Sequence, residues 1–317
     1  MMKINLLRIV PFFMVFITLF LNTINASAIK EIKAELVSGG HLIGQLQVSA
    51  ALRFNGKMIP TDETGYFQLG FSRELAGLHE IEVITPDQPI SYYPIWIDVR
   101  EFNVQRVNGV DQAKVTPPKS LQARIEREYF LVKAAKEKQT SIAAWREESF
   151  VWPIFGRITG VYGSQRFYNG IPGSPHWGVD MAARQGTPIY APASGLVTLA
   201  ENDLYFSGGT VILDHGNGLT SSFLHLSKLN VEPGLYLKQG EILGFVGSTG
   251  RSTGPHLDWR MNLGDTRIDA QLWVPNMDSL CVFSTKACPT PKNISQQEEL
   301  QWLHNRKAFL ARSLSGS

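Results

Sequence analysis

Cysteine is scarce in this chain of 317 residues, and its two copies, Cys281 and Cys288, lie close together near the C-terminal end. Two cysteines are too few for a thiolate-rich metal site, and neither stands in an obvious nucleophile motif. In an oxidising compartment the pair can close one small loop, and the alternative is two free thiols. Any metal site must therefore be built from histidine and carboxylate ligands.

The chain also lacks an excess of charge of either sign. Thirty Lys and Arg residues stand against 28 Asp and Glu residues, for a formal net charge of +2. We therefore expect no nucleic-acid partner, because such proteins carry a basic patch or stripe. A phosphate-binding loop of the Walker type is missing too. The run 244–254 is rich in Gly, Ser and Thr but lacks the G-x-x-x-x-G-K-[ST] spacing, so we interpret it as a loop that lets the backbone approach a cleft.

The N-terminus has the pattern of a signal peptide over residues 1–28. Lys3 and Arg8 supply positive charge, an apolar run follows from Ile9 to Leu21, and a small-x-small cleavage site ends at Ala28. The apolar run is short for a membrane span, which needs about 20 residues. We expect export to the periplasm or cell envelope, with an uncleaved anchor as the alternative.

The rest of the chain predicts a mainly β protein in four parts. Residues 29–116 show short β segments with turn signals, among them Asn55-Gly56, which is typical of a hairpin, and indicate a small β-sandwich. Apolar residues at helical spacing between 120 and 148 predict a helical linker, 117–149. Residues 150–275 are dense in glycine and short apolar runs and predict a β-rich domain. A C-terminal extension, 276–317, contains a predicted helix over 296–314.

The β-rich domain holds most of the residues suited to metal chemistry. A zinc hydrolase needs about three imidazole or carboxylate ligands and groups that move protons. His176 and Asp180 stand in H-x-x-x-D spacing, His225 follows an apolar run, and His256 and Asp258 are two apart. In a strand, residues two apart point to the same face. His215 lies in a turn-like segment, where a structural role is the better interpretation.

Several of these motifs, in this order, resemble the lysostaphin-like (LytM-domain) zinc metalloendopeptidases, which cleave peptide cross-links of bacterial peptidoglycan. The resemblance covers about 152–262 and rests on five segments. They are His176-Trp177-Gly178-Val179-Asp180, the hairpin 211–218, Phe223-Leu224-His225-Leu226, the run 238–244 and Gly254-Pro255-His256-Leu257-Asp258-Trp259. The resemblance implies a metallopeptidase domain of the duplicated hybrid motif type with one Zn²⁺ per chain. It also implies peptidoglycan as partner, His176 and Asp180 as metal ligands, and His225 and His256 as catalytic residues.

The sequence departs from the family pattern at one ligand. Where the family has the second histidine of H-x-H, this chain has Asp258, which is still a zinc-ligand type. Two carboxylates would neutralise the ion, which predicts activity at higher pH than a site with two histidines. One alternative is a catalytically inactive wall-binding protein that activates another cell-wall hydrolase, an amidase. A sugar-binding β-protein is a further alternative without a specific motif.

Overall fold

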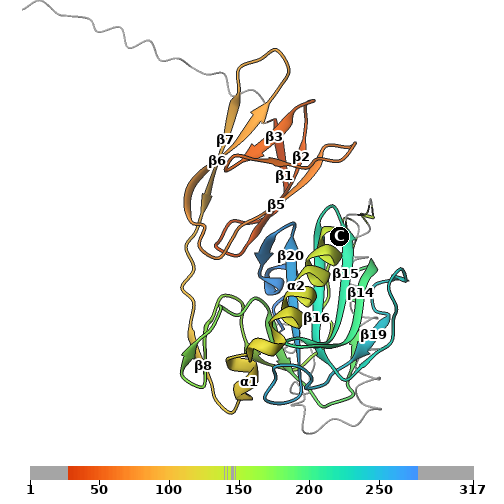
Figure 1. Ribbon diagram of the computed structural model, residues 1–317. Helices are drawn as coiled ribbons and strands as arrows, with labels where there is room; N and C mark the ends of the chain where they lie inside the picture. Colours follow the sequence, from red (N-terminus) through yellow and green to blue (C-terminus); the bar gives the residue numbers. More distant parts are fainter. Residues whose placement is uncertain (1–27, 139, 141, 144–145, 147, 278–317) are drawn as a thin grey trace, which may run out of the picture.

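The computed structural model describes residues 28–138, 140, 142–143, 146 and 148–277 as two β-rich units joined by an extended segment and a helix (Figure 1). The predicted signal peptide, both cysteines and the predicted helix 296–314 lie outside the described residues. Across the part of the chain that is described, no helix is long and apolar enough to cross a membrane. The mainly β fold class is confirmed.

The N-terminal unit consists of two small antiparallel sheets over a shared apolar core. The first sheet has the order β1-β2-β5 and the second β4-β3-β6-β7. Their strands are β1 (Ile29–Glu35), β2 (His41–Leu46), β3 (Ala51–Phe54), β4 (Lys57–Ile59), β5 (Tyr66–Gly70), β6 (Gly77–Ile84) and β7 (Ser91–Ile97). Leu42, Leu52, Phe67 and Ile81, from both sheets, are at most 1% exposed. Burying these side chains from both sheets ties the sheets together.

The predicted hairpin at Asn55-Gly56 is confirmed. The two residues join β3 to β4 with φ angles of +47° and +78°, the left-handed conformation that a tight two-residue turn requires. β2 and β3 follow each other closely in the chain but enter different sheets, and residues 47–50 form the break between them.

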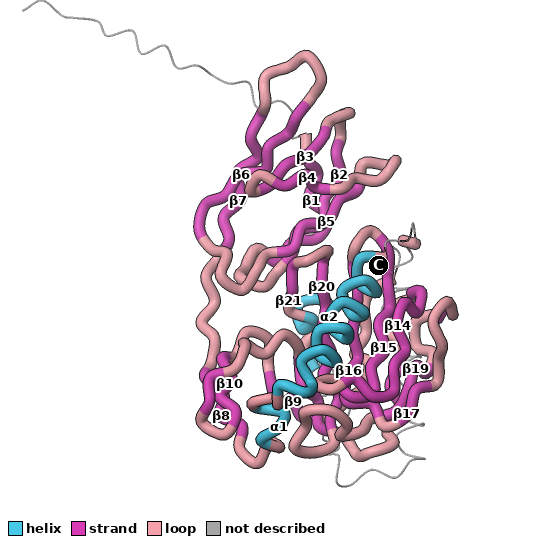
Figure 2. The backbone as a smooth tube through the Cα atoms, viewed as in Figure 1, coloured by secondary structure: helices cyan, strands magenta, loops and turns pink. Residues whose placement is uncertain are grey.

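The connecting segment is more closely tied to the second unit than the sequence indicated. β8 (Val104–Val107) pairs in parallel with β10 (Gln165–Tyr168), which in turn pairs with β11 (Ile171–Pro172). After α1 (Gln112–Val115) and a short 3-10 turn (Lys119–Leu121) comes α2 (Gln122–Glu137), the predicted linker helix. It lies along the sheet of the second unit (Figure 2), where Ala135 packs with Leu199 and Ile212.

α2 ends about ten residues before the predicted end of the linker helix. Lys138 has an extended backbone, and the amide of Thr140 donates to Asp214 Oδ2 at 2.9 Å. The chain therefore exchanges helical hydrogen bonds for tertiary ones, which local periodicity does not reveal. Lys136, in the last turn, donates from Nζ to Asn262 Oδ1 at 2.8 Å and fastens the helix to the sheet.

The second unit is built on an eight-stranded sheet of order β18-β14-β15-β16-β20-β12-β9, with β21 beside β20. Its strands are β9 (Arg157–Gly160), β12 (Val179–Ala182), β14 (Gly195–Leu204), β15 (Gly208–Gly216), β16 (Leu219–Leu226), β18 (Tyr236–Leu237), β20 (His256–Leu263) and β21 (Thr266–Ile268). A smaller sheet has the order β13 (Pro188–Tyr190), β19 (Ile242–Phe245) and β17 (Lys228–Leu229), and a 3-10 turn spans Ala270–Trp273. Every residue of β15 and β16 is buried, as expected for central strands covered on both faces.

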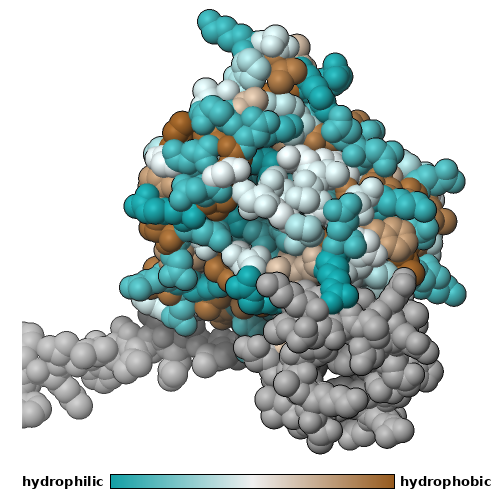
Figure 3. Space-filling view, turned by 90° about the horizontal axis from the view of Figure 1, so that it is seen from below, coloured by the Kyte–Doolittle hydropathy of each residue, from teal (hydrophilic) through white to brown (hydrophobic). Residues whose placement is uncertain are grey.

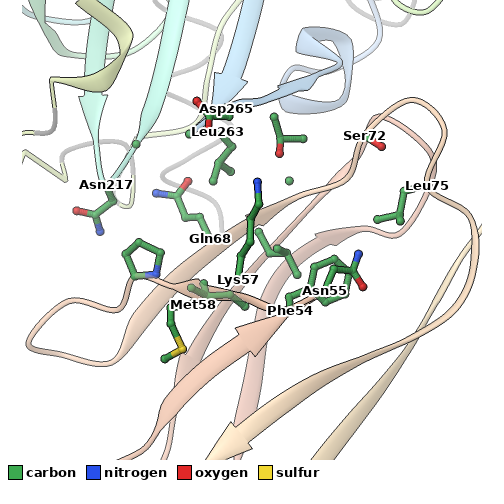
Figure 4. A pocket seen from close by; sticks show the side chains of 17 residues that line it. Phe54, Asn55, Lys57, Met58, Gln68, Ser72, Leu75, Asn217, Leu263 and Asp265 are labelled. Carbon is green, nitrogen blue, oxygen red and sulfur yellow. The ribbon is translucent and has the colours of Figure 1, made fainter. Parts of the chain in front are cut away.

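The two units touch through a small set of specific contacts. His41 in β2 is fully buried and stacks on Trp273, with ring centroids 4.1 Å apart. Arg100 donates to Asp269 at 2.8 Å. A cavity of about 350 Å³ also lies between the units, lined by Lys57, Gln68 and Leu75 on one side and by Asn217, Leu263 and Asp265 on the other (Figure 4). Asn217 and Leu263 lie at the ends of β16 and β20 that are remote from His225 and His256, so this cavity is separate from the candidate site.

Candidate metal centre

Strand pairing brings the two candidate carboxylate ligands together. β12 and β20 are antiparallel neighbours, and Asp180 lies directly opposite Asp258. Residues paired in this way point to the same face of the sheet. Two like charges in this position repel, so the arrangement requires nearby positive charge. Both carboxylates are almost fully buried, at 5% and 1% exposure.

His176 completes a group of three. Its backbone amide donates to Ser164 O at 2.8 Å, which fixes the loop before β12. Its Nε2 atom lies 3.1 Å from Asp180 Oδ1. One ligand atom from each of His176, Asp180 and Asp258 lies within 4.8 Å of the other two. The structure thus brings together the three residues that the sequence proposed as ligands.

The backbone at Gly178, just before β12, and at Gly160, in β9, has no room for a side chain. A Cβ atom at Gly178 would meet Asp258 Oδ1 at 2.2 Å, and one at Gly160 would meet Asp180 Oδ2 at 2.4 Å. Glycine at these two positions lets the backbone approach both carboxylates closely. Neither position was identified from the sequence, although Gly178 falls inside the H-x-x-x-D motif.

The two candidate catalytic histidines lie next to each other beside this group. His225 ends β16 and His256 begins β20, and their ring centroids are 4.8 Å apart. His256 Nε2 is 3.8 Å from Asp180 Oδ1. All five residues selected from the sequence therefore meet in one place, at the end of the second unit where β8 and α1 lie. Figure 3, seen from below, shows hydrophilic residues interspersed with small apolar groups over this end of the molecule.

Backbone carbonyls orient both imidazoles. His225 Nδ1 lies 2.7 Å from Thr249 O, and His256 Nδ1 lies 2.8 Å from Gly254 O. A carbonyl oxygen only accepts, so each Nδ1 must carry the proton, and each neutral ring has a free Nε2 lone pair. Burial, with the neighbouring His256, lowers the pKa of His225 to about 4. His225 is therefore neutral near pH 7 and able to accept a proton.

Two arginines that the sequence reasoning did not consider pair with the carboxylates. Arg166 forms an ion pair with Asp180 Oδ2, and its Nε donates to Gln105 Oε1 at 2.8 Å. Arg260 donates to both oxygens of Asp258, with Nε at 3.1 Å from each and Nη2 at 2.6 Å from Oδ2. The sequence alone could have suggested Arg260 as a partner of Asp258, because it lies two residues later on the same strand and therefore on the same face. Arg166 and Gln105 depend on the β8–β10 pairing.

These arginines keep both carboxylates ionised. Burial alone would raise the pKa of Asp180, but His176 and Arg166 outweigh it and lower that pKa far below its usual range. For Asp258, burial likewise raises the pKa, and Arg260 with His176 reverses the effect to a net lowering. Two guanidinium groups also balance the two carboxylate charges. The expectation of activity at higher pH counted the charges of the two carboxylates and the metal ion alone. With the two arginines included, the carboxylates no longer give the site extra negative charge, so this expectation loses its electrostatic basis.

The group fits a metal ion of the zinc type. His176 Nε2 and Asp180 Oδ1 are buried, lie 3.1 Å apart and have no hydrogen-bond partner outside this pair within the described residues. Both atoms point to the same place, and imidazole nitrogen with carboxylate oxygen is a usual zinc ligand set. Asp258 is shared with Arg260, yet a carboxylate has about four lone-pair sites and Arg260 occupies only part of them.

His215 does not belong to the site. It is fully buried, with Nδ1 2.8 Å from Ser194 O and Nε2 2.9 Å from Ser221 Oγ. Both ring nitrogens are thus occupied by β-strand neighbours, and burial lowers the pKa of His215 to about 4. The predicted structural role is the one observed.

The fold and the site together define a β-rich protein with a candidate mononuclear metal centre flanked by two histidines. The family model described as peptidase family M23 matches residues 174–270, which include all five site residues. The catalytic domain of the antimicrobial peptidase lysostaphin from Staphylococcus simulans is 36% identical; the alignment covers 36% of this chain and 88% of that chain, with a TM-score of 0.34. The chain therefore belongs to peptidase family M23.

Two further comparisons extend this finding. A crystal structure of a peptidase M23 from Pseudomonas aeruginosa is 28% identical, covers 75% of this chain and 94% of that chain, and has a TM-score of 0.57. Residues 99–317, the chain without the N-terminal unit, make up about 69% of it, so a match over 75% includes part of that unit. The peptidoglycan DD-endopeptidase ShyA from Vibrio cholerae is 41% identical over 88 residues, 28% of this chain and 20% of the relative. The first curated relatives are matched over only 20–27% of their own length.

Proposed function

We propose that this chain is an exported zinc metalloendopeptidase that hydrolyses peptide cross-links of bacterial peptidoglycan. The observation that carries the proposal is the convergence of three ligand atoms within 4.8 Å beside two histidines with free Nε2 atoms. Membership of family M23 and the similarity to a peptidoglycan DD-endopeptidase support the substrate class. The signal-peptide pattern supports export to the periplasm or cell envelope.

Each residue has a role that follows from its contacts. His176, Asp180 and Asp258 would hold one zinc ion, which when bound supplies Lewis-acid polarisation of the scissile carbonyl and acidifies water. Arg166 and Arg260 keep the two carboxylates ionised and oriented. Such partners behind ligands fix ligand geometry.

The two histidines handle protons. Near pH 7 the neutral His225 can accept a proton at Nε2 from the attacking water. The imidazolium formed in this way can donate that proton to the departing amine. His256, whose ring centroid lies 4.8 Å from that of His225, can bind the oxyanion on the carbonyl oxygen as an imidazolium, because only then does its Nε2 donate.

Metal content and product analysis on the full chain test this proposal. We expect about one zinc per chain by mass spectrometry and peptide fragments from purified cell wall. His176→Ala should lose both, whereas His79→Ala, which removes a histidine of the N-terminal unit, should keep both. A zinc-free protein that releases no fragments would refute the proposal.

One observation favours a second candidate, a regulator that activates a peptidoglycan amidase. Both carboxylates already accept from guanidinium groups, and Arg166 and Arg260 compete with a metal ion for their oxygens. If this competition prevails, the site is a stable ion-pair cluster without metal. Zinc-free protein that stimulates an added amidase would then be the expected result.

A further inference from the structure

A third arginine, Arg251, stands beside the candidate centre without a carboxylate partner. Arg166 pairs with Asp180 and Arg260 with Asp258, so two positive and two negative charges balance. Within the described residues, Arg251 makes no ion pair with any carboxylate. Its only side-chain hydrogen bond to another described residue goes from Nη1 to the backbone oxygen of Lys114, at 3.4 Å.

The loop that carries Arg251 also holds the two catalytic histidines. Thr249, two residues before it, accepts from His225 Nδ1, and the hydroxyl of Ser252, the next residue, lies 3.2 Å from His256 Nδ1. Arg251 is therefore fixed in sequence between two residues that touch the catalytic pair.

Aromatic rings hold the guanidinium in place. Its carbon lies 4.4 Å from the centroid of the Tyr168 ring and 4.8 Å from that of Phe206. The backbone amide of Arg251 donates to Phe206 O at 2.8 Å. Contacts of a guanidinium with ring faces reduce its freedom but leave its N–H groups available at the edge. The side chain is thus oriented before any ligand binds.

The surroundings make this positive charge costly for the protein alone. Burial lowers the pKa of Arg251; Arg260 and Arg166 add to this shift, while Tyr168 and Asp258 oppose it. A half-buried, unpaired charge beside like charges destabilises the folded chain. Such a group is typical of a binding site, because an arriving anion relieves the repulsion.

We propose that Arg251 binds a free carboxylate of the peptide substrate, on the residue next to the scissile amide. The inference rests on the proposed peptidase function and narrows its substrate class. It favours cross-links whose scissile bond adjoins an acidic residue such as diaminopimelate, over glycine bridges that carry no free carboxylate there. Arg is suited to this task because its fork of N–H groups matches a carboxylate.

Two synthetic cross-linked peptides that differ only in this carboxylate or its carboxamide test the inference. Binding is measured by calorimetry on the full chain carrying His225→Ala, which prevents turnover. We expect about 10- to 100-fold tighter binding of the carboxylate peptide, the usual value of a charge-assisted hydrogen bond. Arg251→Gln should abolish this preference and Arg251→Lys should retain part of it.

Matched controls separate the possible outcomes. Arg127→Gln removes an exposed arginine of α2 and should leave the preference unchanged. In the active chain, Arg251→Gln should raise KM for the carboxylate peptide more than it lowers kcat. Equal binding of both peptides, or a preference that survives Arg251→Gln in folded protein, would overturn the inference. If the carboxylate peptide binds preferentially but the active chain does not hydrolyse it, the peptidase function is refuted while the role of Arg251 in binding stands.

Discussion

Acidification should weaken the folded state through His41, at the contact between the two units. Its ring is fully buried against Trp273, and both ring nitrogens lack a hydrogen-bond partner among the described residues. Burial, with the nearby charge of Lys33, lowers the pKa of His41 to about 3. In the unfolded chain a histidine has a pKa of about 6.5, so at mildly acidic pH the unfolded state binds a proton at His41 and the folded state does not.

The sign and size of the effect follow from this difference. Between about pH 6.5 and pH 3 the unfolded state binds more protons, so stability falls as the pH falls. Above about pH 6.5 the two states bind protons equally at this site, and the contribution is complete. At about pH 5, which is about 1.5 units below the pKa of histidine in the unfolded chain, the free energy of unfolding is lower by roughly 2 kcal/mol than it is above pH 6.5.

Urea unfolding at about pH 8 and at about pH 5, followed by tryptophan fluorescence, measures this loss of unfolding free energy. His41→Phe keeps an aromatic ring against Trp273 but cannot titrate. We expect the parent to lose about 2 kcal/mol more than this variant between the two pH values. His79→Phe, in the same unit, controls for the number of histidines and should behave as the parent does. Parallel pH dependences of the parent and His41→Phe would refute the reasoning.

Three further predictions concern the site and its boundary. Asp258→Ala should lose zinc whereas Asp258→His should retain it; if the alanine variant binds zinc as tightly as the parent, Asp258 is not a ligand. His225→Ala should keep zinc and lose about 10²- to 10⁴-fold in rate on cell wall, and an equal loss of zinc in this variant and in His176→Ala would contradict its role as a proton acceptor. A fragment that starts at residue 150 should fold and retain zinc. It lacks β8 and α2, however, so its urea midpoint should lie below that of a fragment starting near residue 99, and equal midpoints would show that both elements are dispensable for stability.

Local motifs, together with the family resemblance that they carry, were sufficient to select the candidate site residues. His176 and Asp180 lie in one short motif, and His256 and Asp258 alternate along one strand, so their relations depend only on backbone geometry over a few residues. The Asn55-Gly56 hairpin was predictable for the same reason, since a two-residue turn needs positive φ angles. The role of His215 followed from its place at a turn. In each case the deciding interaction is short in sequence.

Contacts between distant segments were not predictable in this way. Arg166, which pairs with Asp180, lies in β10 and also donates to Gln105 in β8, a segment that the sequence placed in the other unit. The helix ends at Glu137 because Thr140 bonds to Asp214, which is 74 residues away. No periodicity or motif encodes such a pairing, since it depends on which surfaces the folded chain brings together.

At Asp258 the contributions of the sequence and of the tertiary structure can be separated. Its position and its suitability as a ligand follow from the sequence, because a carboxylate two residues after His256 in a strand must share its face. Its charge balance was decided by tertiary structure. The pairing of β12 with β20 sets Asp180 against it, and the arginines around both carboxylates compensate the repulsion. Residue identity fixed which atoms can bind a metal ion, whereas packing determined what else those atoms already bind.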